Sequence, residues 1–205
     1  MRQLKVRCAH DGVEHHQHNP VRRYVADNLQ SDRILRARRY VESSLALCGP
    51  GKKTIVELGC GVLDISGPFS DYHEVIGREC HEGCAQDAVK TYPKAIVSVG
   101  AIEEVLPFSC DVLVLCEILE HLEDPLKLIA RWLPRARAVV ISHPLNGDIQ
   151  HDFSGGDHCW SYNDADHMEW FAVGGHRVIE TQRFEMGSYR IIMSRSMNLI
   201  SEIPA

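Results

Sequence analysis

The most constraining feature of this 205-residue sequence is a short apolar run that ends in an acid and two glycines, Thr54-Ile55-Val56-Glu57-Leu58-Gly59-Cys60-Gly61. The run is rich in β-branched residues and has glycines on both sides, so it predicts a buried strand. Glycines directly after a strand allow a tight turn and let a ligand approach the backbone closely. We therefore expect a ligand to lie against the turn formed by Gly59, Cys60 and Gly61.

A second predicted strand, Glu74-Val75-Ile76-Gly77-Arg78, leads directly to another acid, Glu79. Glu79 lies at about the distance from the glycines at which nucleotide-binding sheets place a carboxylate that accepts hydrogen bonds from a ribose. The two features together indicate a nucleotide-binding sheet.

Length and composition are those of an ordinary globular protein with one sizeable core: 44% of the residues are hydrophobic, 24% are charged, and the formal net charge is −6. This acidic balance excludes a surface that binds polyanions over its whole extent. No apolar run reaches membrane-spanning length, and the N-terminus lacks the apolar segment of a signal peptide. The eight cysteines are scattered, which favours reduced thiols in a cytoplasmic protein.

The chain divides into an N-terminal part, residues 1–50, and a larger domain, residues 51–205. Residues 1–20 are polar and crowd four histidines near Cys8, so we expect a flexible segment that could order as a lid; a zinc site is the alternative. A helical pattern then runs from Asp27 to about Leu47 and predicts a capping helix. Its arginines form a solvated face or a contact for phosphates or an acidic substrate.

Within the larger domain, strands and helices alternate. The expected strands span 54–58, 74–79, 95–99, 112–116 and 138–142, and the expected helices span 63–66, 81–91, 124–133 and 162–173. Two further β-runs, 177–184 and 189–196, predict a hairpin. The expected fold is α/β: a Rossmann-like, mostly parallel seven-stranded sheet with helices on both faces and a C-terminal antiparallel hairpin.

In such sheets, ligands bind at the carboxyl ends of the strands. Four predicted strand ends carry acids, glycines or cysteines that would line one crevice: Glu57–Gly61, Glu79, Gly100–Glu103 and Cys116-Glu117. These blocks, together with Leu106-Pro107-Phe108 and Cys116–Pro125, resemble the class I S-adenosylmethionine-dependent methyltransferases. Cys116–Pro125 is similar to the Glu-x-x-Glu-His-x-x-Asp-Pro pattern of the small-molecule and ubiquinone-biosynthesis O-methyltransferase branch. The resemblance covers about residues 52–197.

The resemblance implies that S-adenosylmethionine is the cofactor and assigns roles by position. Glu57 would orient the methionine end, Glu79 would accept from both ribose hydroxyls, and the turn of Gly59, Cys60 and Gly61 would lie against the cofactor. The remaining implied cofactor residues are Ala101 and Ile102, which flank the adenine, and Cys116 and Glu117, which lie beside the methionine and the acceptor.

The implied reaction is methyl transfer to an oxygen or nitrogen acceptor on a small molecule. A sulfonium methyl group is already activated, so the protein mainly aligns the acceptor with it and excludes water. His121 and His143 are candidate general bases, because an imidazole near neutral pKa can take a hydroxyl proton. Neither the Asn/Asp-Pro-Pro-aromatic tetrad nor a Pro-Cys nucleophile of base methylation is present. The sequence does not indicate an oligomeric state.

Two alternatives remain open. Glu117, Glu120 and His121, with His158, resemble the metal site of small-RNA terminal 2′-O-methyltransferases, which would make the protein a metal-assisted RNA methyltransferase. We instead interpret this Glu-His pair as a structural feature of the loop and expect no metal ligands.

Leu63 stands where the family usually has a third glycine, and Ala101 replaces an acid that is common in the family. These departures motivate a second alternative, a degenerate non-catalytic interaction module.

Overall fold

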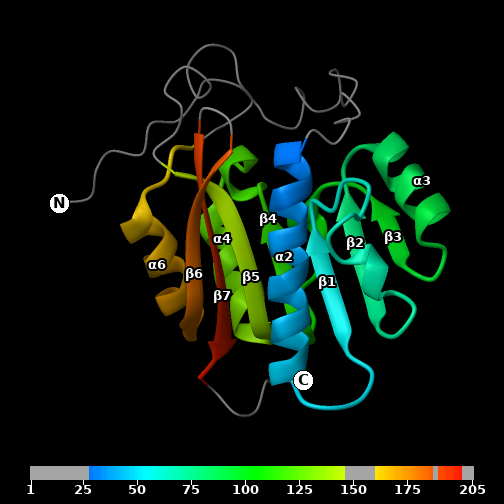
Figure 1. Ribbon diagram of the computed structural model, residues 1–205, viewed down its shortest axis with the longest axis horizontal. Helices are drawn as coiled ribbons and strands as arrows, with labels where there is room; N and C mark the ends of the chain where they lie inside the picture. The colour runs from blue at the N-terminus through cyan, green and yellow to red at the C-terminus, as the bar shows by residue number, and fades with distance from the viewer. Residues whose placement is uncertain (1–27, 146–159, 187–188, 200–205) are drawn as a thin grey trace.

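The computed structural model describes residues 28–145, 160–186 and 189–199, in which helices flank both faces of a seven-stranded sheet (Figure 1). The strands are β1 (Thr54–Leu58), β2 (Glu74–Glu79), β3 (Ile96–Val99), β4 (Cys110–Cys116), β5 (Ala136–Leu145), β6 (His176–Met186) and β7 (Tyr189–Asn198). The α-helices are α2 (Asn28–Leu47), α3 (Glu82–Thr91), α4 (Pro125–Trp132) and α6 (Asp164–Val173). Four 3₁₀ turns complete the described elements: η1 (Gly67–Phe69), η2 (Ile102–Glu104), η3 (Leu119–His121) and η4 (Leu133–Arg135).

The strand order is β3-β2-β1-β4-β5-β7-β6. Strands β1 to β5 are parallel, β7 is antiparallel to β5, and β6 is antiparallel to β7. The predicted fold class is therefore confirmed, including the C-terminal hairpin. Because β1 to β5 run in the same direction, their carboxyl ends meet at one edge of the sheet, which is where the predicted site residues lie.

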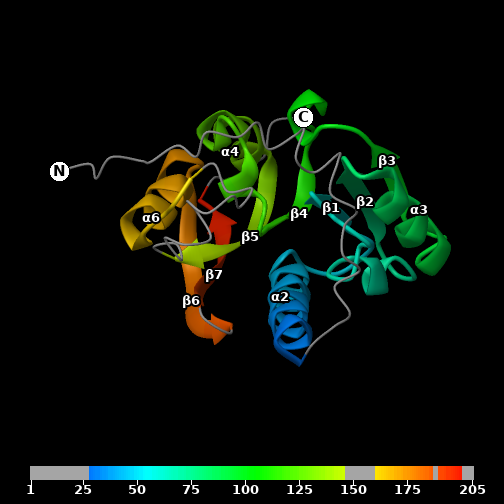
Figure 2. The ribbon, with the colours of Figure 1, turned by 90° about the horizontal axis from the view of Figure 1, so that it is seen from above.

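The sheet has a hydrophobic core on each face. Figure 2 shows α2 on one face and α4 and α6 on the other. β4 contributes to both cores, because Leu113 and Leu115 pack with the α4 side, whereas Val112 and Val114 pack with the α2 side. This explains why β4 is a continuous apolar run, as expected of a strand buried on both faces.

Helix α2 packs directly on the sheet. Ala37, Val41 and Leu45 follow each other at four-residue steps and are all buried in the core that also contains β1 and β4. The predicted helix is confirmed to within one residue at its start, although Leu35, which the apolar pattern includes, is 48% exposed. Residues 1–27, with the histidine cluster and the expected lid, lie outside the described residues. No described helix is both long and apolar enough to cross a membrane.

The helix predicted for 63–66 is wrong. After the glycine turn the chain forms successive turns and then η1. The backbone N–H of Ser66 donates to the Glu57 carboxylate (3.0 Å) rather than to a helical carbonyl, and Pro68 has no N–H to donate. One helical hydrogen bond does form, from the Gly67 N–H to the Leu63 carbonyl (2.9 Å), but Pro68 cannot donate the next one, so the turn does not extend into a helix.

Leu63 does not close the carboxyl edge of the sheet, because its side chain is fully buried in the core on the α2 side. It adopts a left-handed backbone conformation (φ 64°), which is unfavourable for a residue with a Cβ. Gly77 on β2 leaves room for it: a Cβ there would lie 3.1 Å from a Leu63 methyl and 2.8 Å from the Cys60 sulfur.

Leu63→Gly is expected to lower the free energy of unfolding by about 1–3 kcal/mol. Removing a buried leucine costs about 2–5 kcal/mol, and relief of the left-handed conformation offsets about 1–2 kcal/mol of it. Urea unfolding followed by circular dichroism measures the difference. Leu106→Gly, at a leucine that is 81% exposed, is the control and should change stability by less than about 1 kcal/mol. A more stable Leu63→Gly protein would contradict the interpretation.

Candidate functional site

The glycine turn joins β1 to the end of β2. Gly59 and Cys60 donate their backbone N–H groups to the carbonyl of Arg78 (2.8 and 3.1 Å), and Gly61 donates to Glu79 Oε2 (2.7 Å). Gly59 has φ 69°, and a Cβ there would lie 2.3 Å from the Ile118 side chain. A glycine is therefore required at this position by both backbone conformation and space.

Glu79 connects three strand ends. Its side chain is largely buried and also accepts from the His81 backbone N–H (2.9 Å), while its carbonyl accepts from Gly100 N–H after β3 (2.8 Å). Ala101 and Ile102 follow immediately; Ile102 is buried in the core and Ala101 is partly exposed. The predicted residues on β1, β2 and β3 are thus brought together by direct hydrogen bonds.

Glu57 is buried at the carboxyl end of β1 and accepts from both the backbone N–H and the hydroxyl of Ser66. Burial raises the pKa of Glu57 to about 7, while the two Ser66 hydrogen bonds act to lower it. This carboxylate is therefore poised to become fully ionised when a positive charge arrives nearby.

Glu117 follows β4 in a left-handed conformation (φ 55°). It donates its N–H to the Ser142 carbonyl (2.9 Å) and accepts at Oε1 from the Ser142 hydroxyl (2.7 Å). A non-glycine residue in this conformation stores strain that the surrounding hydrogen bonds must hold. Cys116, directly before it, is buried, and burial raises its pKa to about 12, so it is a neutral thiol.

Arg33 of α2 belongs to this site, whereas the sequence analysis considered it only together with the other arginines of the helix. Its Nη1 lies 4.0 Å from Glu117 Oε2, its side chain is 18% exposed, and its charge acts to lower the pKa values of Glu57 and Cys116. The signal was present in the sequence, because Arg33 is one four-residue step before the buried series Ala37, Val41 and Leu45. An arginine in the buried stripe of a helix indicates a partner inside the protein.

Glu120 and His121 lie on η3, beside Trp160. Glu120 is buried (2% exposed), and its Oε1 is 3.9 Å from His121 Nε2. Trp160 holds this turn through its backbone N–H to the Glu120 carbonyl (3.1 Å) and its indole N–H to the Leu122 carbonyl (2.8 Å). No group of three metal-ligating side chains occurs among the described residues, and His158 lies outside them.

His143 is fully buried in a directed chain of hydrogen bonds between β5, α6 and β7. Its Nδ1 must donate to the Pro144 carbonyl (2.8 Å), so its Nε2 accepts from His167 Nδ1 (2.9 Å). His167 Nε2 then accepts from the Ser194 hydroxyl (2.7 Å). Burial lowers the pKa of His143 to about 4. Both ring nitrogens are engaged and away from solvent, so the geometry disfavours His143 as a general base.

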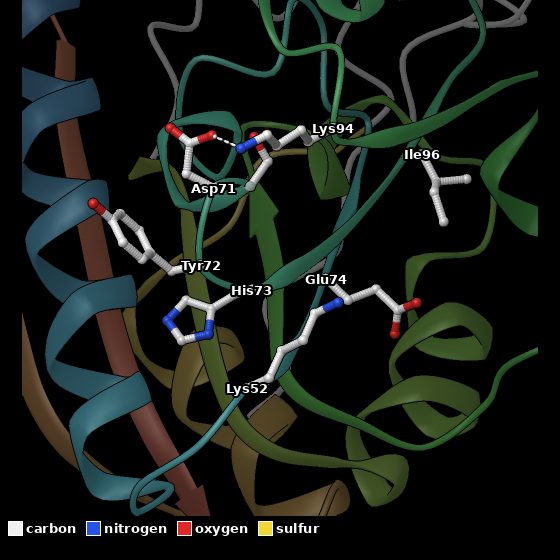
Figure 3. A pocket seen from close by; sticks show the side chains of 8 residues that line it. Lys52, Asp71, Tyr72, His73, Glu74, Lys94 and Ile96 are labelled. Carbon is white, nitrogen blue, oxygen red and sulfur yellow. Dashed lines mark ion pairs between the residues drawn. The ribbon is translucent and has the colours of Figure 1, made fainter.

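A hollow of about 380 Å³ lies elsewhere on the protein (Figure 3). It is lined by Lys52, Ser70, Asp71, Tyr72, His73, Glu74, Lys94 and Ile96. Glu74 and Ile96 begin β2 and β3, so the hollow is at the amino end of the sheet, opposite the candidate site. Its lining is mostly polar, and one of its two lysines, Lys94, already pairs with Asp71 at 2.8 Å.

No protein-family model and no curated protein matches the chain. Solved structures match it over most of its length. Magnesium protoporphyrin IX methyltransferase (ChlM) from Synechocystis PCC 6803 with bound SAM matches with a TM-score of 0.72 and 15% identity, covering 93% of this chain and 98% of that chain. The same protein with bound SAH gives 0.71 and 14%, covering 92% and 93%.

Two other solved structures are similar to the chain. A TehB-like SAM-dependent methyltransferase from Corynebacterium glutamicum ATCC 13032 has a TM-score of 0.57 and 18% identity, over 79% of this chain and 86% of that one. The [4+2]-cyclase SpnF has a TM-score of 0.66 and 9% identity, over 84% of both chains. At these identities the likeness establishes architecture, and one architecture supports several reactions. The chain therefore has the fold of the class I S-adenosylmethionine-dependent methyltransferases.

Proposed function

We propose that the protein binds S-adenosylmethionine at the carboxyl ends of β1 to β4 and transfers its methyl group to an oxygen or nitrogen atom of a small molecule. One observation carries this proposal: hydrogen bonds through Glu79 join the glycine turn, the end of β2 and the loop after β3 into a single cradle. The fold supports it, since two structures with this fold hold SAM or SAH.

In this proposal Glu79 binds the ribose. Each of its carboxylate oxygens accepts one backbone N–H, from Gly61 or His81. A carboxylate oxygen has two lone-pair directions, so Oε2 can also accept from one ribose hydroxyl. At Oε1 the second hydroxyl would replace the Cys80 thiol, a weaker donor that lies 3.4 Å away. Ala101 and Ile102 then flank the adenine, and Gly59 and Gly61 allow the close approach of the cofactor.

The methionine end fits the charges around Arg33. One cation, Arg33, lies near two acids, Glu57 and Glu117. The cofactor carries the complementary set: a carboxylate to pair with Arg33, and an ammonium and a sulfonium to face the acids. Binding would lower the pKa of Glu57, because a positive charge favours its ionised form.

Methyl transfer then depends mainly on alignment, because the sulfonium is the activated group. We assign the proton acceptor to His121, whose side chain is 20% exposed beside the turn held by Trp160.

The net charge of −6 supports a small molecule over a nucleic acid as the acceptor of the methyl group. The Glu117–Pro125 block supports the O-methyltransferase branch.

Binding of S-adenosylhomocysteine is the first test. At a ligand concentration 100 times Kd, the protein should gain about 2.7 kcal/mol of stability, which corresponds to a Tm increase of roughly 5–10 °C for a chain of this size. Calorimetry should show heat for S-adenosylhomocysteine and none for homocysteine alone, which lacks the nucleoside. Absence of both heat and a Tm shift would contradict the proposal and favour the degenerate interaction module.

A further inference from the structure

Arg78 connects the two sides of the proposed cofactor cradle. Its backbone carbonyl accepts from Gly59 and Cys60 in the glycine turn (2.8 and 3.1 Å). Its side chain extends toward the loop after β3, where Nε donates to the Ala101 carbonyl (3.3 Å) and Nη2 pairs with Glu104 (3.3 Å). One residue of β2 thus contacts both segments that would enclose the nucleoside.

Gly100 provides the space for this side chain. A Cβ at Gly100 would lie 2.1 Å from Arg78 Nη2 and 2.7 Å from its guanidinium carbon. The guanidinium therefore lies directly against the Gly100 backbone, and its side chain is only 18% exposed. This contact fixes the guanidinium close to the peptide groups of the loop.

The loop is held from two directions. Arg131 of α4 donates to the carbonyls of Glu103 and Val105 (2.9 and 3.1 Å) in the later part. Arg78 holds the earlier part, Gly100 and Ala101, and the proposed function places Ala101 beside the adenine. The ion pair with Glu104 adds little, because the Glu104 side chain is 71% exposed and surface pairs are weak. The contribution of Arg78 thus comes mainly through the Ala101 peptide.

We propose that Arg78 is a positioning residue that sets the nucleobase specificity of the cofactor site by fixing the Gly100–Ala101 backbone. This inference depends on the proposed function. Backbone polar groups can distinguish adenine from hypoxanthine only when their positions are fixed, since the two bases differ only in which of the six-position and N1 donates and which accepts. A loose loop would bind both bases with similar affinity.

Arg78→Lys is the decisive variant, because lysine keeps the charge but cannot donate from Nε to Ala101 while also reaching Glu104. The matched control is Arg195→Lys. Arg195 has a similarly buried side chain (15% exposed) and donates from Nε to Glu180 (3.0 Å), but it lies on β7 in the C-terminal hairpin. Glu104→Gln removes only the exposed ion pair.

Calorimetry with S-adenosylhomocysteine and with its inosine analogue measures base discrimination. In Arg78→Lys, affinity for S-adenosylhomocysteine should fall about 5- to 10-fold, as expected for one hydrogen bond, and the preference for adenine should fall by a similar factor. Arg195→Lys and Glu104→Gln should stay within about twofold of wild type. An unchanged preference for adenine in Arg78→Lys would overturn the proposal, even if both affinities fell.

Hydrogen exchange of the ligand-free proteins separates this inference from the proposed function. Arg78→Lys should accelerate exchange in residues 100–104 severalfold, and Arg195→Lys should not. Unchanged exchange there would overturn the positioning role. If wild-type protein bound neither nucleoside, the proposed function and the specificity role would both fail, while exchange would still report whether Arg78 holds the loop.

Discussion

Lowering the pH from 7 to 5 is expected to reduce the free energy of unfolding by about 2–4 kcal/mol. The cause is the buried chain from Thr181 through Ser194 and His167 to His143, in which every ring lone pair accepts a hydrogen bond. A proton added to either imidazole would remove one of these acceptors and leave a charge in the core. Burial is the main cause that lowers the pKa of both rings.

The free energy of unfolding falls with pH because the folded and unfolded chains bind different numbers of protons. Histidines in the unfolded chain take up protons below about pH 6.5, whereas the buried rings do not, so unfolding is favoured as the pH falls. Each such histidine lowers the free energy of unfolding by about 1.4 kcal/mol for each pH unit below its unfolded pKa.

Other groups also change the pH dependence. His176, buried against Ser196 and Leu133, acts in the same direction as the buried pair, whereas Glu57, whose pKa is raised to about 7, opposes it. Asp164 acts to raise the pKa of His143, and Arg183 acts to lower that of His167.

Urea unfolding between pH 5 and pH 8 measures this dependence. The matched variant is His167→Gln, because glutamine can donate to His143 and accept from Ser194 without titrating. It should be less stable at pH 8, but its stability should depend on pH less steeply, by about 1.4 kcal/mol per unit between pH 5 and pH 6. Parallel curves for the two proteins would show that the buried pair is not the cause.

Glu79→Ala is expected to weaken binding of S-adenosylhomocysteine by about 2–4 kcal/mol, the value of one or two hydrogen bonds to a charged group. The substitution removes both proposed ribose contacts and also the acceptor for Gly61 and His81. Calorimetry at pH 7.5 measures the loss.

The matched control for this variant is Glu74→Ala, at the opposite end of the same strand, where the glutamate is exposed and accepts from Thr54. The affinity of Glu74→Ala for S-adenosylhomocysteine should equal that of wild type. Glu79→Gln keeps one carbonyl oxygen and should lose less affinity than Glu79→Ala. Unchanged affinity in Glu79→Ala would refute the placement of the ribose, whereas a loss in Glu74→Ala would indicate a general effect on the sheet.

Patterns within short segments were sufficient for most of the fold. The strand at 54–58 and the helix from residue 28 to Leu47 were predicted nearly to the residue, because apolar spacing directly reports which side chains face a core. The error at 63–66 has a tertiary cause. Leu63 adopts a left-handed conformation (φ 64°), which is not helical, and packs against Gly77 of β2, a contact that no local pattern reports.

The site shows the same division between local and distant information. Glu57, Glu79 and Glu117 were identified by their positions at the carboxyl ends of strands, since parallel strands bring such ends together. The fully buried position of His143 was not predicted, because its partner His167 is 24 residues away in the sequence and Ser194, which bonds to His167, lies on β7. Arg33 was grouped with the other helix arginines, as part of a solvated face or as a contact for phosphates or an acidic substrate, and its place near Glu117 was not predicted.

The sequence alone determined the alternation of strands and helices, the mostly parallel sheet with its terminal hairpin, and the edge at which polar side chains collect, because periodicity and glycine turns act over a few residues. The order of the strands in the sheet came from the tertiary structure. Only the tertiary structure decided which of those side chains remain available for chemistry. Burial and hydrogen bonding depend on residues that are distant in the chain: His143 is enclosed by α6 and β7, while Arg33 is brought from α2 to the ends of β1 and β4.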